Sequence, residues 1–168
     1  MLNDIFNEND MSKLQTLLRA NKQTITAAES CTGGLVASMI TKLSGSSDIF
    51  NGSIVTYSNK IKNQELNVKN ETLDKYGAVS CEVVQEMLDG VIDKFEADFA
   101  IAISGIAGPN GGTKNKPVGT VVIGISNSNN HKIVNVYNFN GSREEVQIQA
   151  AKHSLKEILK FVQKSLDK

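Results

Sequence analysis

Residues 24–34 read TITAAESCTGG, and this segment predicts a buried strand that turns sharply into a helix. Its first half is short and partly β-branched, which is typical of a strand inside a sheet. The two glycines then end the strand before a predicted helix from about Leu35 to Leu43. A second strand from Phe50 to Tyr57 is followed in the same way by a helix from Asn59 to Leu66, so strands and helices alternate along the chain.

The flanking segments extend this alternation. Asp10 is expected to cap an N-terminal helix, and Ser80 a longer helix that ends before a strand from Asp98 to Ser104. Near the C-terminus, a turn at residues 127–130 joins two strands as a hairpin, and Ser142 opens a capping box for a closing helix. Alternating strands and helices predict an α/β fold, a three-layer α/β/α sandwich, and the hairpin predicts a mixed sheet.

The composition fits one ordinary globular domain. The 168 residues suffice for a single core over residues 1–168 and are few for two domains. The 18 basic and 18 acidic residues cancel, so we expect neither nucleic acid nor a membrane as a partner. Only two cysteines occur, no apolar run is long enough to span a bilayer, and the first residues do not form a signal peptide. These features predict a cytoplasmic protein.

Three polar loops follow predicted strands, at residues 29–34, 57–62 and 104–112. If the three strands are neighbours and parallel, their loops meet at one edge of the sheet, where sites form in α/β folds. The third loop belongs to a stretch from Gly105 to Val118 that holds four glycines and both prolines. Such a stretch fits either a phosphate-binding nest of N–H groups or a mobile surface loop, and its length favours function.

The first loop offers a nucleophile, either Ser30 or Cys31. The helix that follows presents free N–H groups and the positive end of its dipole, which suit an oxyanion or a phosphate. The same residues also fit a serine helix cap followed by a glycine turn, with no catalytic role. When this loop is considered alone, that structural interpretation is favoured. No Gly-Lys-Ser/Thr follows the glycines, and Gly33 stands where an SxxK motif has its lysine, so both of those motifs are excluded.

The second loop supplies bases for such a hydroxyl, since a serine needs a neighbouring proton acceptor at neutral pH. His131 lies at a hairpin edge and His153 on the closing helix, so neither is well placed. Lys60 and Lys62 are the candidates, because burial or a nearby cation lowers a lysine pKa, and Tyr57 would relay or orient the proton. Taken singly, either lysine is better explained as a surface residue.

Together the three loops resemble the CinA C-terminal domain family, whose stand-alone members are nicotinamide-nucleotide amidohydrolases. The resemblance runs from about residue 12 to the end of the chain, and five ordered motifs at family-like spacing make it specific. The matching stretches are residues 26–34 (TAAESCTGG), 55–59 (VTYSN), 77–80 (GAVS), 104–109 (SGIAGP), and 111–112 (GG) with 116–120 (KPVGT).

The resemblance implies a three-layer sandwich on a five-stranded mixed sheet. It also implies hydrolysis of the carboxamide of nicotinamide mononucleotide to nicotinic acid mononucleotide and ammonia. Ser30 matches the nucleophile, Lys62 rather than Lys60 the base, and Tyr57 a supporting residue. The positions that would bind substrate or supply turn geometry and N–H donors are Thr32, Gly33, Gly34, Ser104, Gly105, Gly108 and Arg143. The family pattern calls for no metal and no cofactor, and the sequence has no His/Cys/Asp cluster at ligand spacing.

Two positions around the start of the closing helix depart from the family pattern. The family usually has Gly-Asp-Arg where this chain has Gly141-Ser142-Arg143, and a second arginine where it has Gln147. Arg143 is retained, and we expect it to reach a phosphate of the substrate. We expect the two changes to affect either the affinity for phosphate or a contact between subunits. We also expect the protein to be a homo-oligomer.

Three alternatives stay open on the sequence. Cys31 would give a cysteine enzyme, because a position near a helix N-terminus lowers a thiol pKa. The same pocket could bind a nucleotide without hydrolysing it. The protein could also be an amidase for another pyridine or nucleotide amide, since pocket shape sets substrate choice.

Overall fold

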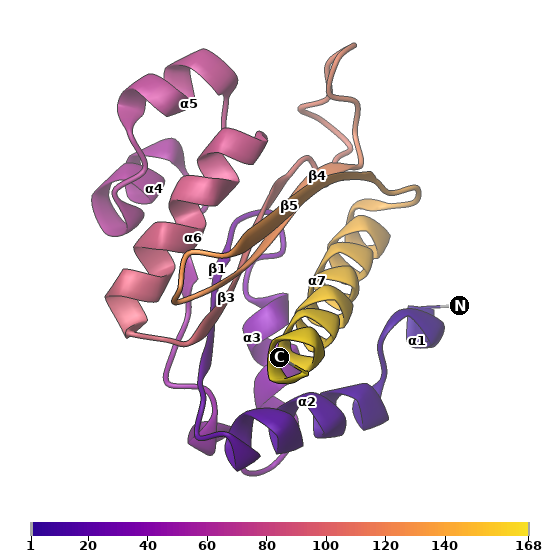
Figure 1. The fold of residues 1–168 in the computed structure, drawn as a ribbon. Coiled ribbons are helices and arrows are strands. Elements are labelled where there is room, and N and C mark those ends of the chain that lie inside the picture. The colour runs from indigo at the N-terminus through magenta and orange to yellow at the C-terminus, as the bar shows by residue number, and fades with distance from the viewer. Residues whose placement is uncertain (1, 168) are drawn as a thin grey trace.

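A five-stranded sheet in the order β2-β1-β3-β4-β5 forms the middle layer of the protein (Figure 1). The computed structural model describes residues 2–167. β1 pairs in parallel with β2 and β3, whereas β4 pairs antiparallel with β3 and β5, so the predicted mixed sheet is confirmed. The strands are β1 (Ile25–Glu29), β2 (Ile54–Val55), β3 (Phe99–Gly105), β4 (Thr120–Asn127) and β5 (Lys132–Asn138).

Two groups of helices cover the opposite faces of this sheet, which confirms the predicted three-layer sandwich (Figure 1). The first group is α1 (Leu2–Ile5), α2 (Glu8–Ala20), α3 (Leu35–Thr41) with the short 3-10 helix η1 (Ser46–Asp48) after it, and α7 (Arg143–Leu166). The second group is α4 (Asn59–Leu66), α5 (Asn70–Tyr76) and α6 (Cys81–Phe95).

Side chains of different size point to the two faces of β3 and set how closely each layer packs. Phe99, Ile101 and Ile103 are large and belong to the core beneath α7. Ala100 and Ala102, which point to the opposite face, are small. Gly124 of β4 also faces α6, since a Cβ atom there would come within 2.6 Å of a Val84 methyl group. Small residues on this face therefore let α6 lie close against the sheet.

The second strand is much shorter than the predicted Phe50–Tyr57. Only β2 joins the sheet as a strand, and a single bridge links Phe50 to β1. The reason lies at Gly52, which packs against the ring of Phe95 and whose carbonyl accepts a hydrogen bond from the Thr26 hydroxyl at 2.7 Å. A side-chain donor thus takes the place of a ladder bond, and the chain runs beside β1 without pairing continuously.

The N-terminal helix begins earlier than predicted. Asn7, not Asp10, is the N-cap of α2, and Asp10 is the third helical residue. The two side chains form a reciprocal capping box, in which the Asn7 oxygen accepts from the Asp10 N–H at 3.1 Å and the Asp10 carboxylate accepts from the Asn7 N–H at 3.0 Å. Short helix α1 was not predicted.

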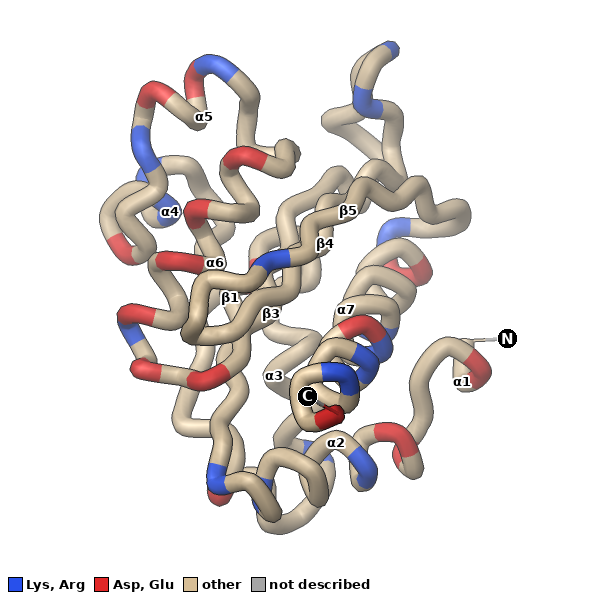
Figure 2. The backbone as a smooth tube through the Cα atoms, viewed as in Figure 1, with Lys and Arg blue, Asp and Glu red and all other residues tan. Residues whose placement is uncertain are grey.

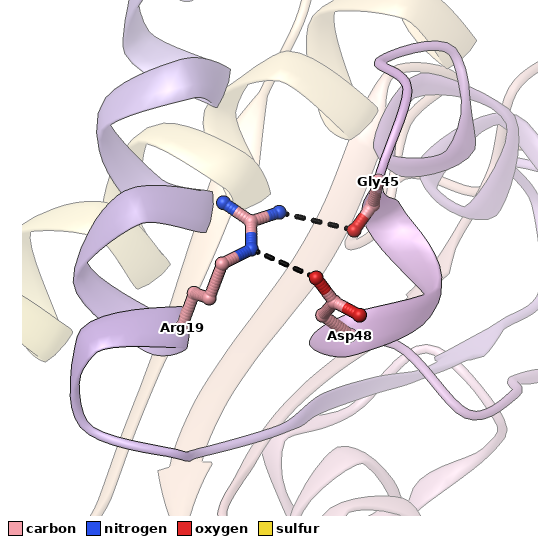
Figure 3. Close-up of polar contacts among 3 residues, drawn as sticks. All are labelled: Arg19, Gly45 and Asp48. Carbon is pink, nitrogen blue, oxygen red and sulfur yellow. Dashed lines mark hydrogen bonds and ion pairs between the residues drawn. The ribbon is translucent and has the colours of Figure 1, made fainter.

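Arg19, near the end of α2, connects this helix to the turn that follows α3 (Figure 3). Its Nε donates to Asp48 at 3.0 Å, and its Nη2 donates to the Gly45 carbonyl at 3.0 Å. Both charged side chains are substantially exposed, at 42% and 61%, so the ion pair adds about 0–1 kcal/mol to stability. The contact mainly holds the two segments in a fixed relative position.

Basic and acidic residues are interspersed over the outer helices, while the sheet is nearly free of charge (Figure 2). This distribution agrees with the formal net charge of zero. Within residues 2–167, no helix is both long and apolar enough to cross a membrane.

Candidate active site

The three polar loops meet at one edge of the sheet, as expected for neighbouring parallel strands. β1 lies between β2 and β3, and the chain leaves all three strands at the same edge. The Ser30 N–H donates to the Ile103 carbonyl at 3.0 Å, which holds the first loop against the end of β3. Contacts between side chains of these loops, described below, define a candidate active site.

Ser30 and Lys62 form a direct pair at the centre of this site. The Lys62 Nζ lies 3.0 Å from the Ser30 Oγ and donates to the Thr56 carbonyl at 2.7 Å. Lys62 reaches inward from α4, whose N-cap is Ser58, and only 1% of its surface is exposed. The Thr56 carbonyl fixes one side of the amine, so the neutral Nζ keeps a lone pair that can accept the Ser30 proton.

Burial gives Lys62 the pKa that a base needs. Desolvation disfavours the ammonium form and lowers the pKa of Lys62 from 10.5 to about 8. Roughly a tenth of the molecules then carry the neutral amine at pH 7. Lys60, two residues earlier on the same helix, is exposed, so the structure separates the two lysines that the sequence offered as bases.

The neighbouring thiol is a poor nucleophile in this setting. Cys31 is 4% exposed, and burial raises the pKa of its thiol to about 12. The thiol therefore stays protonated at neutral pH, although it lies near a helix N-terminus. This observation weighs against the cysteine-enzyme alternative.

A buried carboxylate occupies the N-terminus of α3. Glu29 has no exposed surface, and its carboxylate accepts bonds from the Thr32 hydroxyl at 2.7 Å and from three backbone N–H groups. These N–H groups belong to Gly34, Val36 and Ala37, at 3.2, 2.9 and 3.2 Å. The helix end that we expected to hold a substrate anion is thus filled by a side chain of the protein itself.

This arrangement changes which N–H groups are available to a substrate. Gly33 donates to the Ser30 carbonyl, Leu35 donates to the Thr32 carbonyl, and Gly34 donates to Glu29. Across residues 30–37, the backbone N–H groups without an acceptor on another residue are those of Cys31 and Thr32. Gly33 and Gly34 shape the turn through positive φ angles of 59° and 108°, but their N–H groups are engaged.

The third loop is joined to the second by Arg143, the first residue of α7. One guanidinium nitrogen donates to the Tyr57 hydroxyl at 2.7 Å, and another donates to the Gly108 carbonyl at 2.6 Å. Tyr57 is 61% exposed and makes this bond rather than one with Lys62 or Ser30. The structure therefore places Tyr57 at the mouth of the site, beside the cation expected to meet a phosphate.

Ser104, Gly105 and Gly108 lie where the predicted third loop leaves the sheet. Ser104 is buried at the end of β3. At Gly105 an added Cβ would lie 2.8 Å from a Val121 methyl group and 3.0 Å from the Thr120 carbonyl oxygen, so the close packing favours glycine there. Gly108 is buried with a φ of 87° and precedes Pro109 through a cis peptide bond. No group of three metal-ligating side chains that could hold a metal ion occurs between residues 2 and 167.

Sequence reasoning did not assign roles to Glu29 and Gln147, which both support the first loop. Gln147, on α7, donates through Nε2 to the Cys31 carbonyl at 2.9 Å. A glutamate a few residues before a glycine turn and a helix fits the preference for carboxylates near helix N-termini, so Glu29 could have been found from the sequence. Nothing local points to the contact of Gln147, because its partner lies 116 residues away.

Comparisons with known proteins agree with this fold and these loops. The sequence profile of the CinA C-terminal domain matches residues 7–162. A CinA-like protein of Prochlorococcus marinus is 56% identical over 151 residues, which are 88% of this chain and 35% of that protein. The nicotinamide-nucleotide amidohydrolase PncC of Enterobacter agglomerans is 48% identical over 143 residues, covering 85% of this chain and 87% of that protein.

Solved structures show the same fold. A CinA superfamily protein of Escherichia coli superposes with a TM-score of 0.89 at 33% identity, covering 95% of this chain and 92% of its own. A homologous protein of Klebsiella pneumoniae gives 0.88 at 33% identity, covering 93% and 97%.

Fold and loops together thus define an α/β/α domain with a serine–lysine pair at the edge of a mixed sheet. The chain belongs to the CinA C-terminal domain family. It spans 35% of the length of the CinA-like protein from Prochlorococcus.

Proposed function

We propose that this chain hydrolyses the carboxamide of nicotinamide mononucleotide, giving nicotinic acid mononucleotide and ammonia. The observation that carries the proposal is the buried Lys62 amine at 3.0 Å from the Ser30 hydroxyl, with a pKa lowered to about 8. A nucleophile and a base within hydrogen-bond reach are the requirement for acyl transfer through a covalent intermediate. The similarity over most of both chains to a nicotinamide-nucleotide amidohydrolase supports this substrate.

In the proposed reaction, the Ser30 oxygen attacks the amide carbon while neutral Lys62 takes the hydroxyl proton. The negative oxygen of the tetrahedral intermediate is stabilised by the unengaged N–H groups that follow the nucleophile, on Cys31 and Thr32. Lys62 then returns the proton to the leaving nitrogen, and ammonia departs from an acyl-serine ester. Water, deprotonated by the same amine, then attacks the ester carbon. The bond to the Ser30 oxygen breaks, Lys62 returns the proton to that oxygen, and nicotinic acid mononucleotide leaves.

The phosphate of the nucleotide would lie at the mouth of the site. Arg143 uses part of its guanidinium on Tyr57 and Gly108, and its exposed position leaves further N–H donors for a phosphate.

A cytoplasmic location is also proposed, since Cys31 and Cys81 are both free thiols. We further propose a homo-oligomer, because Val136 exposes 54% of its surface on the free edge strand β5.

The direct test is to incubate the purified protein with nicotinamide mononucleotide and to quantify ammonia and nicotinic acid mononucleotide. Ser30→Ala and Lys62→Met are expected to lower turnover at least about a hundredfold, because each removes a group that moves or holds the proton. Lys60→Met is the matched control, since this lysine lies on the same helix but is exposed. Turnover should persist with a chelator present.

The outcomes separate the alternatives. A folded wild-type protein that binds the nucleotide without releasing ammonia would be a binding module. Ammonia release from a different pyridine or nucleotide amide, with none from nicotinamide mononucleotide, would keep the chemistry and replace the substrate.

A further inference from the structure

The Thr32 N–H has no acceptor among residues 2–167, and a side chain from outside the loop bonds the carbonyl of the same peptide unit. The Cys31 N–H likewise has no acceptor on another residue in that range. The carbonyl joined to the Thr32 N–H by one peptide bond belongs to Cys31. That carbonyl accepts a hydrogen bond from Gln147 Nε2 at 2.9 Å.

Peptide planarity links the two ends of this unit. In a trans peptide the C=O and N–H point in opposite directions, so a bond that fixes the carbonyl also fixes the direction of the N–H. A donor on the carbonyl additionally polarises the unit and strengthens its N–H as a donor. Gln147 therefore controls the orientation of the Thr32 N–H although it does not touch that group.

The helix that carries Gln147 gives it a rigid base. α7 begins with a capping box, and Val146 and Ala150 on either side of Gln147 are 1% and 0% exposed. Arg143 lies one turn earlier, so residues at i and i+4 share one side of the helix. One helix thus contacts the first loop through Gln147 and the second and third loops through Arg143.

We propose that Gln147 is a positioning residue that, through the Cys31 carbonyl, aims the Thr32 N–H at the oxyanion formed when Ser30 attacks the amide. The inference rests on the proposed function for its reaction, and it goes beyond that function by naming the side chain that orients one of the two oxyanion donors. Its signature is a loss in kcat rather than in KM, because the oxyanion exists only after attack.

The experiment compares four variants on α7. Gln147→Leu and Gln147→Glu both remove the donor, the second with nearly the same shape, and Gln147→Arg restores a donor of greater length. Gln149→Leu is the matched control, since Gln149 donates from the same helix to the carbonyls of Asn140 and Glu145, away from the site. Thermal unfolding establishes that each variant is folded.

We expect Gln147→Leu and Gln147→Glu to lower kcat roughly 10- to 100-fold and to change KM by no more than about twofold. The decrease in kcat should not exceed the one that follows complete removal of an oxyanion donor, because the Thr32 N–H is still present. The apparent pKa of the rate should stay near that of the wild type, since Lys62 is untouched. Gln147→Arg should recover most of kcat, and Gln149→Leu should match the wild type. A kcat within twofold of wild type in both donor-less variants, or an equal loss in Gln149→Leu, would overturn the inference.

A second probe separates failure of this inference from failure of the proposed function. An alkyl fluorophosphonate reacts with an activated serine: the Ser30 oxygen forms a bond to phosphorus, fluoride leaves, and the hydroxyl proton passes to Lys62. Intact mass gives the rate at which the Ser30 adduct forms, and this rate also depends on a donor to the phosphoryl oxygen.

If wild type forms the adduct but does not hydrolyse nicotinamide mononucleotide, the substrate assignment fails alone. A tenfold slower adduct in Gln147→Leu then still supports the positioning role, and equal rates refute it. If wild type neither forms the adduct nor releases ammonia, Ser30 is not a nucleophile and both proposals are refuted.

Discussion

Replacement of Lys62 by methionine should change how the stability of the protein depends on pH. Methionine keeps most of the length and volume of the side chain, which is 1% exposed, and removes only the ionisable amine. It also removes the bonds to Ser30 and Thr56, and leaves the Thr56 carbonyl without that donor. The loss is offset because methionine does not place a cation in a buried position. At pH 7 we therefore expect the free energies of unfolding of wild type and Lys62→Met to differ by no more than about 2 kcal/mol.

The magnitude at higher pH follows from the pKa of the buried amine. The pKa of Lys62 is about 8 in the folded protein and 10.5 in an exposed lysine. Between these values the unfolded chain holds the proton and the folded chain has lost it, so the free energy of unfolding rises with pH. At about 1.4 kcal/mol for each pKa unit, the rise due to Lys62 is about 3 kcal/mol, and it is absent below pH 8.

The measurement is urea unfolding of wild type, Lys62→Met and Lys60→Met at pH 7, 8, 9 and 10. Burial raises the pKa of Cys31 to about 12, which lowers stability with pH above the ordinary thiol value of 9.0, but this contribution is common to all three proteins. The difference between wild type and Lys62→Met should grow in favour of wild type by about 2 to 3 kcal/mol from pH 7 to pH 10. Lys60→Met should follow wild type. Parallel pH dependences of wild type and Lys62→Met would show that the amine is not desolvated in the folded protein and would refute the reasoning.

Three further outcomes follow from the site. The pH profile of kcat/KM should rise about fivefold between pH 7 and pH 8, because the neutral form of Lys62 grows from about a tenth to about a half, and a flat profile would contradict its role as base. Cys31→Ala should keep turnover within about twofold while Ser30→Ala abolishes it, and the reverse result would restore the cysteine mechanism. Glu29→Gln should lower the free energy of unfolding by about 2–4 kcal/mol in urea titrations, because an amide nitrogen would face backbone N–H donors; an unchanged midpoint would contradict the capping role.

Local patterns were sufficient for most of the fold. The β-branched and apolar runs predicted β1, β3 and the β4–β5 hairpin, and the capping box at Ser142 marked the start of α7. These signals are local because a strand or helix displays its periodicity within its own residues. The prediction was wrong where a distant partner intervened: Phe95 and Thr26 engage Gly52 and shorten the second strand.

The candidate site was predicted in part. The sequence identified the polar loops and their residue types, and the family resemblance selected Lys62 over Lys60. It did not show that Glu29 fills the helix N-terminus, and so it assigned N–H donors to Gly33 and Gly34 that are in fact engaged within the loop. Which donor remains free is a property of the whole hydrogen-bond arrangement and cannot be read from residue types alone.

By itself, then, the sequence determined the order of strands and helices, the loops that carry reactive side chains, and the family. Only the tertiary structure decided that Lys62 is buried against Ser30, 32 residues away, and that Gln147 reaches Cys31 across 116 residues. The physical reason is that both contacts depend on strand order and helix packing. The position of β1 between β2 and β3 brings the loops together, and burial between them shifts the pKa of the lysine.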